Sequence, residues 1–235
     1  MFRNPLYYLT IFLATLVVGC GGQPPEATVR ETGLEQTRLQ SPTKSPNDTY
    51  SYRYLLLENG LQALLVSDPD AQKAAAALSV HVGSGENPAG RGGLAHFLEH
   101  MLFLGTDKYP DAGEYGRYIS QYGGSQNAYT DFERTNYFFD VNSSQLPGAL
   151  DRFAQFFIAP RFDDEYVERE KNAVQAEYLQ SLKSDGRRAL DVLQQVMNPQ
   201  HPYHQLAVGT LDTLADQPDS GVREELISFY RTYYS

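Results

Sequence analysis

Residues 93–106 read Gly-Leu-Ala-His-Phe-Leu-Glu-His-Met-Leu-Phe-Leu-Gly-Thr and contain two histidines four residues apart with a glutamate between them. Leucine, phenylalanine and methionine fill most other positions, and Gly105 is a typical helix-stop residue. The stretch therefore predicts a largely buried helix. On that helix His96 and His100 share one face about one turn apart, so both imidazoles can reach one metal ion. Glu99 borders the same face and is placed to hold a water molecule.

A motif this short is not specific on its own, because histidine and glutamate on a helix can also face solvent or pair with each other. The surrounding residues are apolar, which favours burial of the helix: Leu94, Phe97, Leu98, Met101, Leu102 and Leu104. Buried ionisable groups need a compensating partner such as a metal ion. The local sequence thus favours a metal site and leaves the surface alternative open.

A catalytic zinc ion usually has three protein ligands, so a third is expected elsewhere in the chain. A second helical pattern begins near Asp163 and Asp164, whose carboxylates offer capping oxygens. Spacings of three and four residues place one stripe on this helix: Val167, Glu170, Val174, Glu177 and Ser181. The valines indicate an inward-facing stripe, which predicts Glu170 and Glu177 on the buried side, about 10 Å apart. Solvated surface glutamates are the alternative, since most charged helix residues are exposed.

The chain resembles the pitrilysin/insulysin family of zinc peptidases, the inverzincins, from about Tyr52 to Ser235. Three runs carry the resemblance: residues 93–106, the segment from Gly123 and Gly124 to Asn127-Ala128-Tyr129-Thr130, and residues 148–157. The resemblance implies a zinc metalloendopeptidase that hydrolyses oligopeptides or small proteins. It identifies His96, His100 and Glu177 as the zinc ligands and Glu99 as the general base. It also implies that Glu170 is a supporting acidic residue beside the site.

Residues Asn127–Thr130 and Arg134–Val141 read as two strands that follow the Gly123-Gly124 turn. The pattern by itself favours an ordinary hairpin. The resemblance implies more, namely that the first strand binds a peptide substrate as an added β-strand through Asn127 and Ala128. Such main-chain pairing needs an extended peptide but reads little of its sequence.

The N-terminal residues predict the compartment. An apolar stretch from Leu6 to Val18 has the length of a signal-peptide core and is short for a membrane span. Val17-Val18-Gly19-Cys20 resembles a bacterial lipobox, which implies cleavage before Cys20 and acylation of that residue. A buried cysteine inside a membrane anchor is the alternative. Gly21 resembles the outer-membrane sorting pattern, so we expect a periplasmic, outer-membrane-anchored lipoprotein of the cell envelope.

Three segments are predicted: residues 1–19 as signal peptide, 20–49 as lipidated cysteine and flexible linker, and 50–235 as the peptidase domain. The linker range is rich in Pro, Ser, Thr and Gln without apolar periodicity.

In the domain, residues 52–57 and 61–66 predict a hairpin, and Ala74–Val82 a further strand. Strands followed by long helices predict an α+β fold with an antiparallel sheet packed against helices. His81, His201 and His204 are interpreted as structural.

The formal net charge of −10 disfavours a nucleic-acid partner. By the resemblance, the chain is expected to be the N-terminal, zinc-bearing portion of a longer peptidase, incomplete at the C-terminal end of its domain and completed by further C-terminal domains. Two alternatives follow. One is a fragment that binds zinc but is inactive alone, and the other is a non-catalytic structural or binding subunit, which would be expected to lack part of the ligand set.

Overall fold

The computed structural model describes residues 37–38 and 42–234. The chain divides into two compact units, residues 1–68 and 69–235. The predicted signal peptide and Cys20 lie outside the described residues. The range predicted as a linker includes the two residues of strand β1 (Thr37–Arg38).

The first unit contains a three-stranded antiparallel sheet in the order β1-β2-β3. Strand β2 (Ser51–Leu56) and strand β3 (Gln62–Ser67) form the predicted hairpin. Gly60 lies in the turn with φ of +83°, a conformation that side chains disfavour. The amide of Leu57 donates to the carbonyl of Leu61 at 2.9 Å and closes the turn.

The second unit is built on an antiparallel sheet in the order β4-β6-β5. Its strands are β4 (Lys73–Val80), β5 (Ser125–Thr130) and β6 (Thr135–Asn142). The predicted strand Ala74–Val82 ends two residues early. The chain turns there because the amides of Ser84 and Gly85 bond to the carbonyls of Asp131 and Phe132, both at 2.8 Å.

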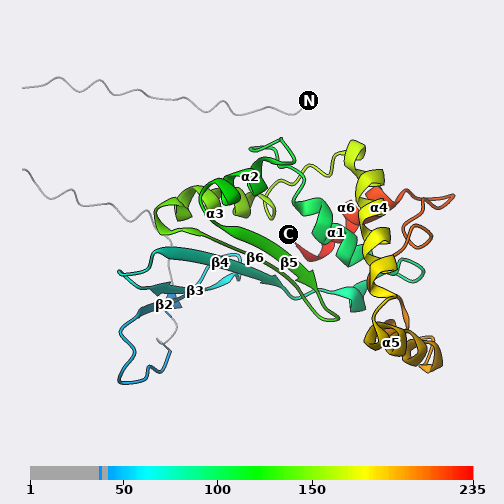
Figure 1. Ribbon diagram of the computed structural model, residues 1–235, viewed down its shortest axis with the longest axis horizontal. Helices are drawn as coiled ribbons and strands as arrows, with labels where there is room; N and C mark the ends of the chain where they lie inside the picture. The colour runs from blue at the N-terminus through cyan, green and yellow to red at the C-terminus, as the bar shows by residue number, and fades with distance from the viewer. Residues whose placement is uncertain (1–36, 39–41, 235) are drawn as a thin grey trace, which may run out of the picture. The chain divides into compact units, whose positions relative to one another are not determined.

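Among the described residues, six α-helices and three short 3₁₀ helices complete this unit. Helices α1, α2 and α3 contact the sheet, and α4 and α6 pack on α1 (Figure 1). The α-helices are α1 (Leu94–Leu102), α2 (Glu114–Gln121), α3 (Leu146–Gln155), α4 (Asp164–Ser181), α5 (Asp185–Val196) and α6 (Val222–Tyr233). The 3₁₀ helices are η1 (Ser84–Glu86), η2 (Ser143–Gln145) and η3 (Pro202–His204).

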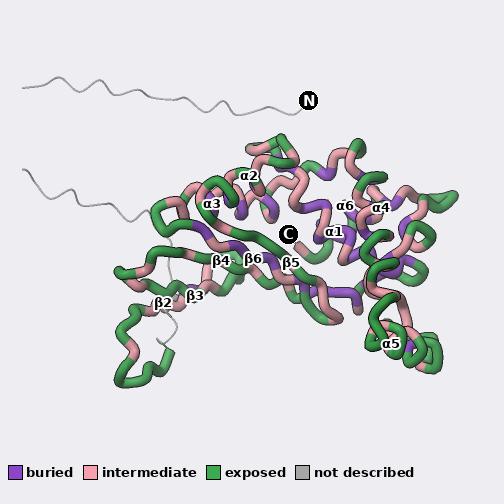
Figure 2. Tube along the Cα trace, in the orientation of Figure 1, coloured by how far each residue is buried: buried purple, intermediate pink, exposed green. Residues whose placement is uncertain are grey.

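The core lies between the central strand β6 and the helices. Strand β6 alternates between buried and more exposed residues, and Tyr137, Phe139 and Val141 point inward. Phe139 packs on Phe153 of α3 with ring centroids 5.2 Å apart. Buried segments line the sheet and α1 (Figure 2). Burying a large apolar side chain stabilises the fold by about 1.5–3 kcal/mol. Helix α1 contributes Leu94, Phe97 and Leu98 to this core. The α+β prediction is confirmed.

Both predicted site helices form. Gly105 has φ of +107° just beyond α1, as expected of a helix-stop glycine. The capping prediction for α4 was wrong, because the Asp163 side chain makes no cap hydrogen bond. Its carboxylate instead pairs with Arg161 at 3.0 Å. In the part of the chain that the structure describes, no helix combines the length and apolarity needed to cross a membrane.

Candidate metal centre

Helix α1 presents its polar residues to a cavity of about 650 Å³. Its remaining surface is packed into the core, where Leu94, Phe97 and Leu98 are completely buried. This packing fixes the rotation of the helix about its axis. His96, Glu99 and His100 therefore line the cavity, whose other walls come from β5, α4, the start of α5 and the loop at residues 207–208. Segments that are distant in sequence meet here.

The two histidines are oriented by hydrogen bonds at their Nδ1 atoms. Nδ1 of His96 lies 2.8 Å from the carbonyl oxygen of Val208, which can only accept, so this nitrogen carries the proton. Nδ1 of His100 lies 3.3 Å from a carboxylate oxygen of Glu170. Both Nε2 atoms are then left as acceptors, and they face each other at 3.3 Å. Metal-binding histidines show this arrangement, in which the second nitrogen is held by an oxygen acceptor.

Close approach of two glycines places the loop that carries Val208. Gly93, the residue before α1, has φ of +89°, and a Cβ built on it would lie 2.2 Å from Cα of Gly209. Only a residue without a side chain permits this contact. The start of α1 is therefore held against the loop that orients His96.

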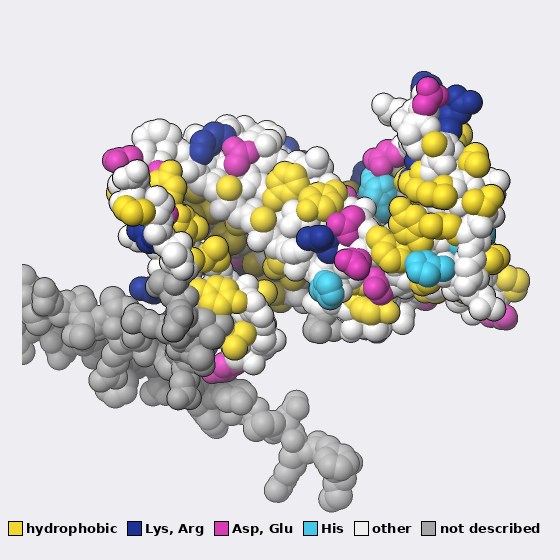
Figure 3. Space-filling view, turned by 90° about the horizontal axis from the view of Figure 1, so that it is seen from below, with side chains coloured by type: hydrophobic (Ala, Val, Ile, Leu, Met, Phe, Trp, Pro, Cys, Tyr) yellow, Lys and Arg dark blue, Asp and Glu magenta, His cyan; other side chains and the backbone are white. Residues whose placement is uncertain are grey.

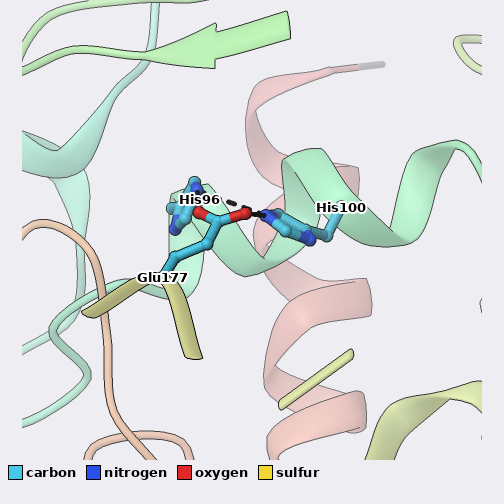
Figure 4. Close-up of side chains that lie close together, drawn as sticks. All are labelled: His96, His100 and Glu177. Carbon is cyan, nitrogen blue, oxygen red and sulfur yellow. Dashed lines mark hydrogen bonds and ion pairs between the residues drawn. The ribbon is translucent and has the colours of Figure 1, made fainter. Parts of the chain in front are cut away.

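Glu177 of α4 completes the group. Its Oε2 lies 3.4 Å from Nε2 of His96, and its Oε1 lies 3.5 Å from Nε2 of His100 (Figure 4). The predicted burial holds for Glu170, whose side chain is 13 % exposed, but is wrong for Glu177, which is 52 % exposed. Val174, one turn earlier in α4, is buried, and beyond it the helix leaves the core and Glu177 reaches the open side of the cavity.

The three side chains fit a zinc ion. Neighbouring ligand atoms of a tetrahedral zinc ion, at bond lengths of about 2.0–2.1 Å, are about 3.3–3.4 Å apart. The two Nε2 atoms are 3.3 Å apart, and each lies 3.4 or 3.5 Å from a different carboxylate oxygen of Glu177. One ligand atom from each of the three residues lies within 4.8 Å of the other two. Two imidazole nitrogens and one carboxylate oxygen are also a donor set that zinc accepts in catalytic sites. Among the described residues, this trio is the group of His, Cys, Asp and Glu able to share a metal.

The ionisable groups around the trio are strongly coupled. Burial lowers the pKa of His96, but the carboxylates of Glu177 and Glu99, which favour the protonated imidazole, outweigh it, so that pKa is raised. Interaction with a protonated His96 in turn lowers the pKa of Glu177. Burial works to raise the pKa of Glu170, but its contacts with His100 and Arg169 bring it below the usual value. Glu170 and Glu177 therefore favour the charged state that binding of a cation requires.

Glu99 differs from the trio. It is 7 % exposed, and its carboxylate accepts a hydrogen bond from the hydroxyl of Thr130 on β5. Burial raises its pKa, against the lowering effect of Thr130 and the two imidazoles. A buried carboxyl with a raised pKa at the wall of a cavity has the properties of a proton-transfer group.

Strand β5 forms the opposite wall of the cavity. It pairs with β6 on one side, and no strand of the described chain pairs with its other side. Asn127 and Ala128 both line the cavity. The amide of Ala128 donates to Oδ1 of its neighbour Asn127 at 2.9 Å rather than to another strand. This edge of the sheet is therefore available to an extended peptide.

Three features of the site were not predicted from the sequence. The Val208 carbonyl is a backbone group and leaves no sequence signal. Thr130 was placed on the correct strand, but its contact with Glu99 depends on tertiary packing. Arg187 of α5 also lines the cavity, and its position at the start of a polar helix resembles an ordinary surface arginine.

The other histidines lie outside the trio. His81 and His201 are exposed. Nδ1 of His204 contacts the carbonyl oxygen of Gln194 at 2.7 Å, and Nδ1 of His201 accepts from the amide of Tyr203 at 3.2 Å. These contacts agree with the structural interpretation.

The chain is similar in sequence to members of one peptidase family. A family model described as insulinase, peptidase family M16, matches residues 62–210. Insulin-degrading enzyme of Homo sapiens is 43% identical over 231 residues, which cover 93% of this chain and 23% of the relative. A second relative, from Schizosaccharomyces pombe, carries the name zinc protease. It is 47% identical over 194 residues, which cover 81% of this chain and 20% of the relative. The chain thus spans about a fifth of the length of these relatives.

The fold has a solved counterpart. The crystal structure of pitrilysin superposes with a TM-score of 0.82 at 42% sequence identity, covering 85% of this chain and 22% of that structure. At this identity the likeness concerns sequence as well as fold.

Proposed function

The chain belongs to the insulinase family of peptidases, family M16, and from this premise we propose that it carries the zinc-dependent catalytic site of a metalloendopeptidase acting on oligopeptides or small proteins. The observation that carries the proposal is the convergence of His96, His100 and Glu177 from two helices at separations that suit one zinc ion. His96 and His100 would hold the ion through Nε2, and Glu177 through its carboxylate.

A zinc ion at this trio would polarise a peptide carbonyl and lower the pKa of a water molecule. Glu99 is the general base in this proposal: it accepts the proton of the attacking water and then passes it to the leaving amine. Its raised pKa favours the second transfer, because a carboxyl that holds its proton more tightly stays protonated nearer neutral pH. Thr130 orients the carboxylate through one oxygen.

Glu170 and Val208 position the histidines rather than touch the substrate. Each holds one Nδ1 atom, so that Nε2 points into the cavity. The substrate would pair with the open edge of β5, along Asn127 and Ala128. For the peptide to bond to the Ala128 amide, the side chain of Asn127 must release it.

Partners and location extend the proposal. Peptide substrates enter the site, further C-terminal domains of a longer peptidase complete it, and acylated Cys20 anchors the protein to the outer membrane from the periplasm. Two alternatives are a portion that binds zinc but is inactive alone and a non-catalytic subunit. The complete trio, together with Glu99, favours a catalytic site over a subunit that only binds peptides.

The test compares zinc content and peptide hydrolysis in the parent and three variants of the full-length protein. Glu99→Gln should keep stoichiometric zinc and lose activity by about 100- to 10,000-fold. Glu177→Gln should lose both. Glu165→Gln, on the exposed first turn of α4, is the matched control and should keep both. Full activity in Glu99→Gln would exclude Glu99 as the base, and stoichiometric zinc in Glu177→Gln would exclude Glu177 as a ligand.

The same assays on the 235-residue chain alone address the first alternative. Zinc binding without turnover is the outcome expected for a portion that is inactive by itself. Turnover at the rate of the full-length protein would contradict it.

A further inference from the structure

Arg187, in the first turn of α5, lines the same cavity as the metal trio. Its side chain is 15 % exposed, so the guanidinium is held in the cavity wall and not in bulk solvent. Apart from Tyr129, every other ionisable residue of the cavity wall is a histidine or a glutamate. Arg187 is therefore the one permanent cation among the described residues of this wall.

The guanidinium of Arg187 is incompletely bonded. Within the described part of the chain it forms one ion pair, with Asp191, where Nε lies 3.1 Å from Oδ1. The direction of this contact does not meet hydrogen-bond geometry, and neither Nε nor Nη2 donates a hydrogen bond within the described residues. Arginine has five N–H donors in a planar fork that suits a carboxylate. The N–H groups of Nε and Nη2 are thus uncommitted, and both nitrogens are buried in the wall.

Helix stability does not account for an arginine at this position. The start of a helix carries partial positive charge, so a cation in the first turn of α5 is disfavoured. An arginine four residues before an aspartate is also the weaker of the two orientations for a helical ion pair. The same partial charge, added to the guanidinium, favours a bound anion.

We propose that Arg187 is a specificity-determining residue that binds a carboxylate of the peptide substrate close to the scissile bond. The carboxylate belongs to an aspartate or glutamate side chain or to the C-terminus of the peptide. The pairing is bidentate and uses the N–H groups of Nε and Nη2, which become accessible when the guanidinium turns from Asp191 into the cavity. It adds a charge preference to the main-chain pairing along β5, which by itself reads little sequence.

This inference rests on the proposed function, because it takes the bound molecule to be a peptide. The test therefore measures binding separately from hydrolysis. Fluorescent peptides that differ only by Glu or Gln at one position near the cleaved bond are titrated against the full-length Glu99→Gln protein. A charged hydrogen-bonded pair corresponds to an affinity preference for Glu of about 10- to 100-fold. A second pair of peptides, with free and amidated C-termini, distinguishes the two sources of the carboxylate.

Four further variants assign the preference to Arg187. Arg187→Gln should abolish it, and Arg187→Lys, which keeps the charge but loses the fork, should reduce it. Arg188→Gln is the matched control, because Arg188 is 65 % exposed on the same helix and pairs with Asp185. Asp191→Asn removes the competing carboxylate and should increase the preference. If the Arg187–Asp191 ion pair had only a structural role, Arg187→Gln and Asp191→Asn would instead have the same effect on the preference for the Glu peptide.

The outcomes are separable. The role of Arg187 would be overturned if the Glu99→Gln protein, with no other substitution, bound the Glu and Gln peptides equally. It would also be overturned if the preference for the Glu peptide survived in Arg187→Gln. If Arg187→Gln does not fold, Arg187→Lys and Asp191→Asn decide, since they should shift the preference in opposite directions. The Glu99→Gln protein could bind the Glu peptide selectively while the protein with Glu99 intact hydrolyses no peptide. That result would support the role of Arg187 and overturn the proposed function.

Discussion

The hydroxyl of Thr130, on strand β5, donates a hydrogen bond to Oε2 of Glu99, on helix α1. The same hydroxyl lies 3.4 Å from that of Thr135, which in turn donates to the carbonyl of Val82 at 3.0 Å. Glu99 is thus connected to the buried end of the sheet, and one carboxylate oxygen is held while the other is left for proton transfer. The strand that forms the substrate edge also positions the proposed base.

Thr130→Val tests this connection. Loss of the hydrogen bond removes an interaction that stabilises the ionised carboxylate, so the pKa of Glu99 should rise further above its ordinary value. Less of the base is then ionised at low pH, and the acidic limb of the pH–rate profile should move to higher pH. We expect kcat to fall about tenfold with zinc content maintained. Thr130→Ser, which keeps a hydroxyl, should retain the parent profile. An unshifted limb in Thr130→Val would show that the bond does not tune Glu99.

Glu170→Ala tests the support of His100. Removing the acceptor frees Nδ1 of His100, and interactions of this kind contribute about 10- to 100-fold in metal affinity. Competition with a chromogenic chelator measures that affinity. Glu165→Ala, in the same helix and away from the cavity, is the control. If zinc affinity is equal in both variants, Glu170 does not position the ligand.

Gly93→Ala tests the junction between α1 and the loop that carries Val208. Both Gly93 and Gly90 have positive φ, but only at Gly93 would a Cβ meet backbone, whereas at Gly90 nothing lies within 4 Å. Gly90→Ala therefore measures the conformational penalty alone, about 1–2 kcal/mol. Gly93→Ala should lower the melting temperature by at least about 4 °C more and weaken zinc binding, because the loop must shift. Equal effects of the two substitutions would mean that the close contact contributes nothing.

The sequence predicted the parts of this site that depend on local periodicity. The spacing of His96, Glu99 and His100 on an apolar helix, and the stripe through Val167 and Val174, were enough to place the two site helices. Periodicity also predicted the hairpin of β5 and β6. Each of these depends on interactions within one element or between neighbouring elements.

Contacts between distant segments could not be read in the same way. The Val208 carbonyl reaches His96 through a loop whose path depends on the Gly93–Gly209 contact. Glu177 was expected to be buried because a helical stripe indicates direction but not where the core ends. Arg187 has no periodic signal at all, since its environment is created by α5 lying against the cavity.

Cys20, the proposed acylation site, lies outside the described residues and is identified from the sequence alone. Leu6–Val18 is shorter than the about 20 residues needed to span a membrane, so retention at the membrane should depend on acyl chains attached to Cys20. Each buried CH₂ contributes about 0.8 kcal/mol, and one chain alone binds only reversibly. Cys20→Ser should therefore lose incorporation of a fatty-acid analogue and leave the membrane fraction. Gly21→Asp, which keeps the cysteine, should remain labelled but move to the inner membrane. Absence of label on the parent, or equal membrane retention of parent and Cys20→Ser, would contradict the lipid anchor without affecting the metal site.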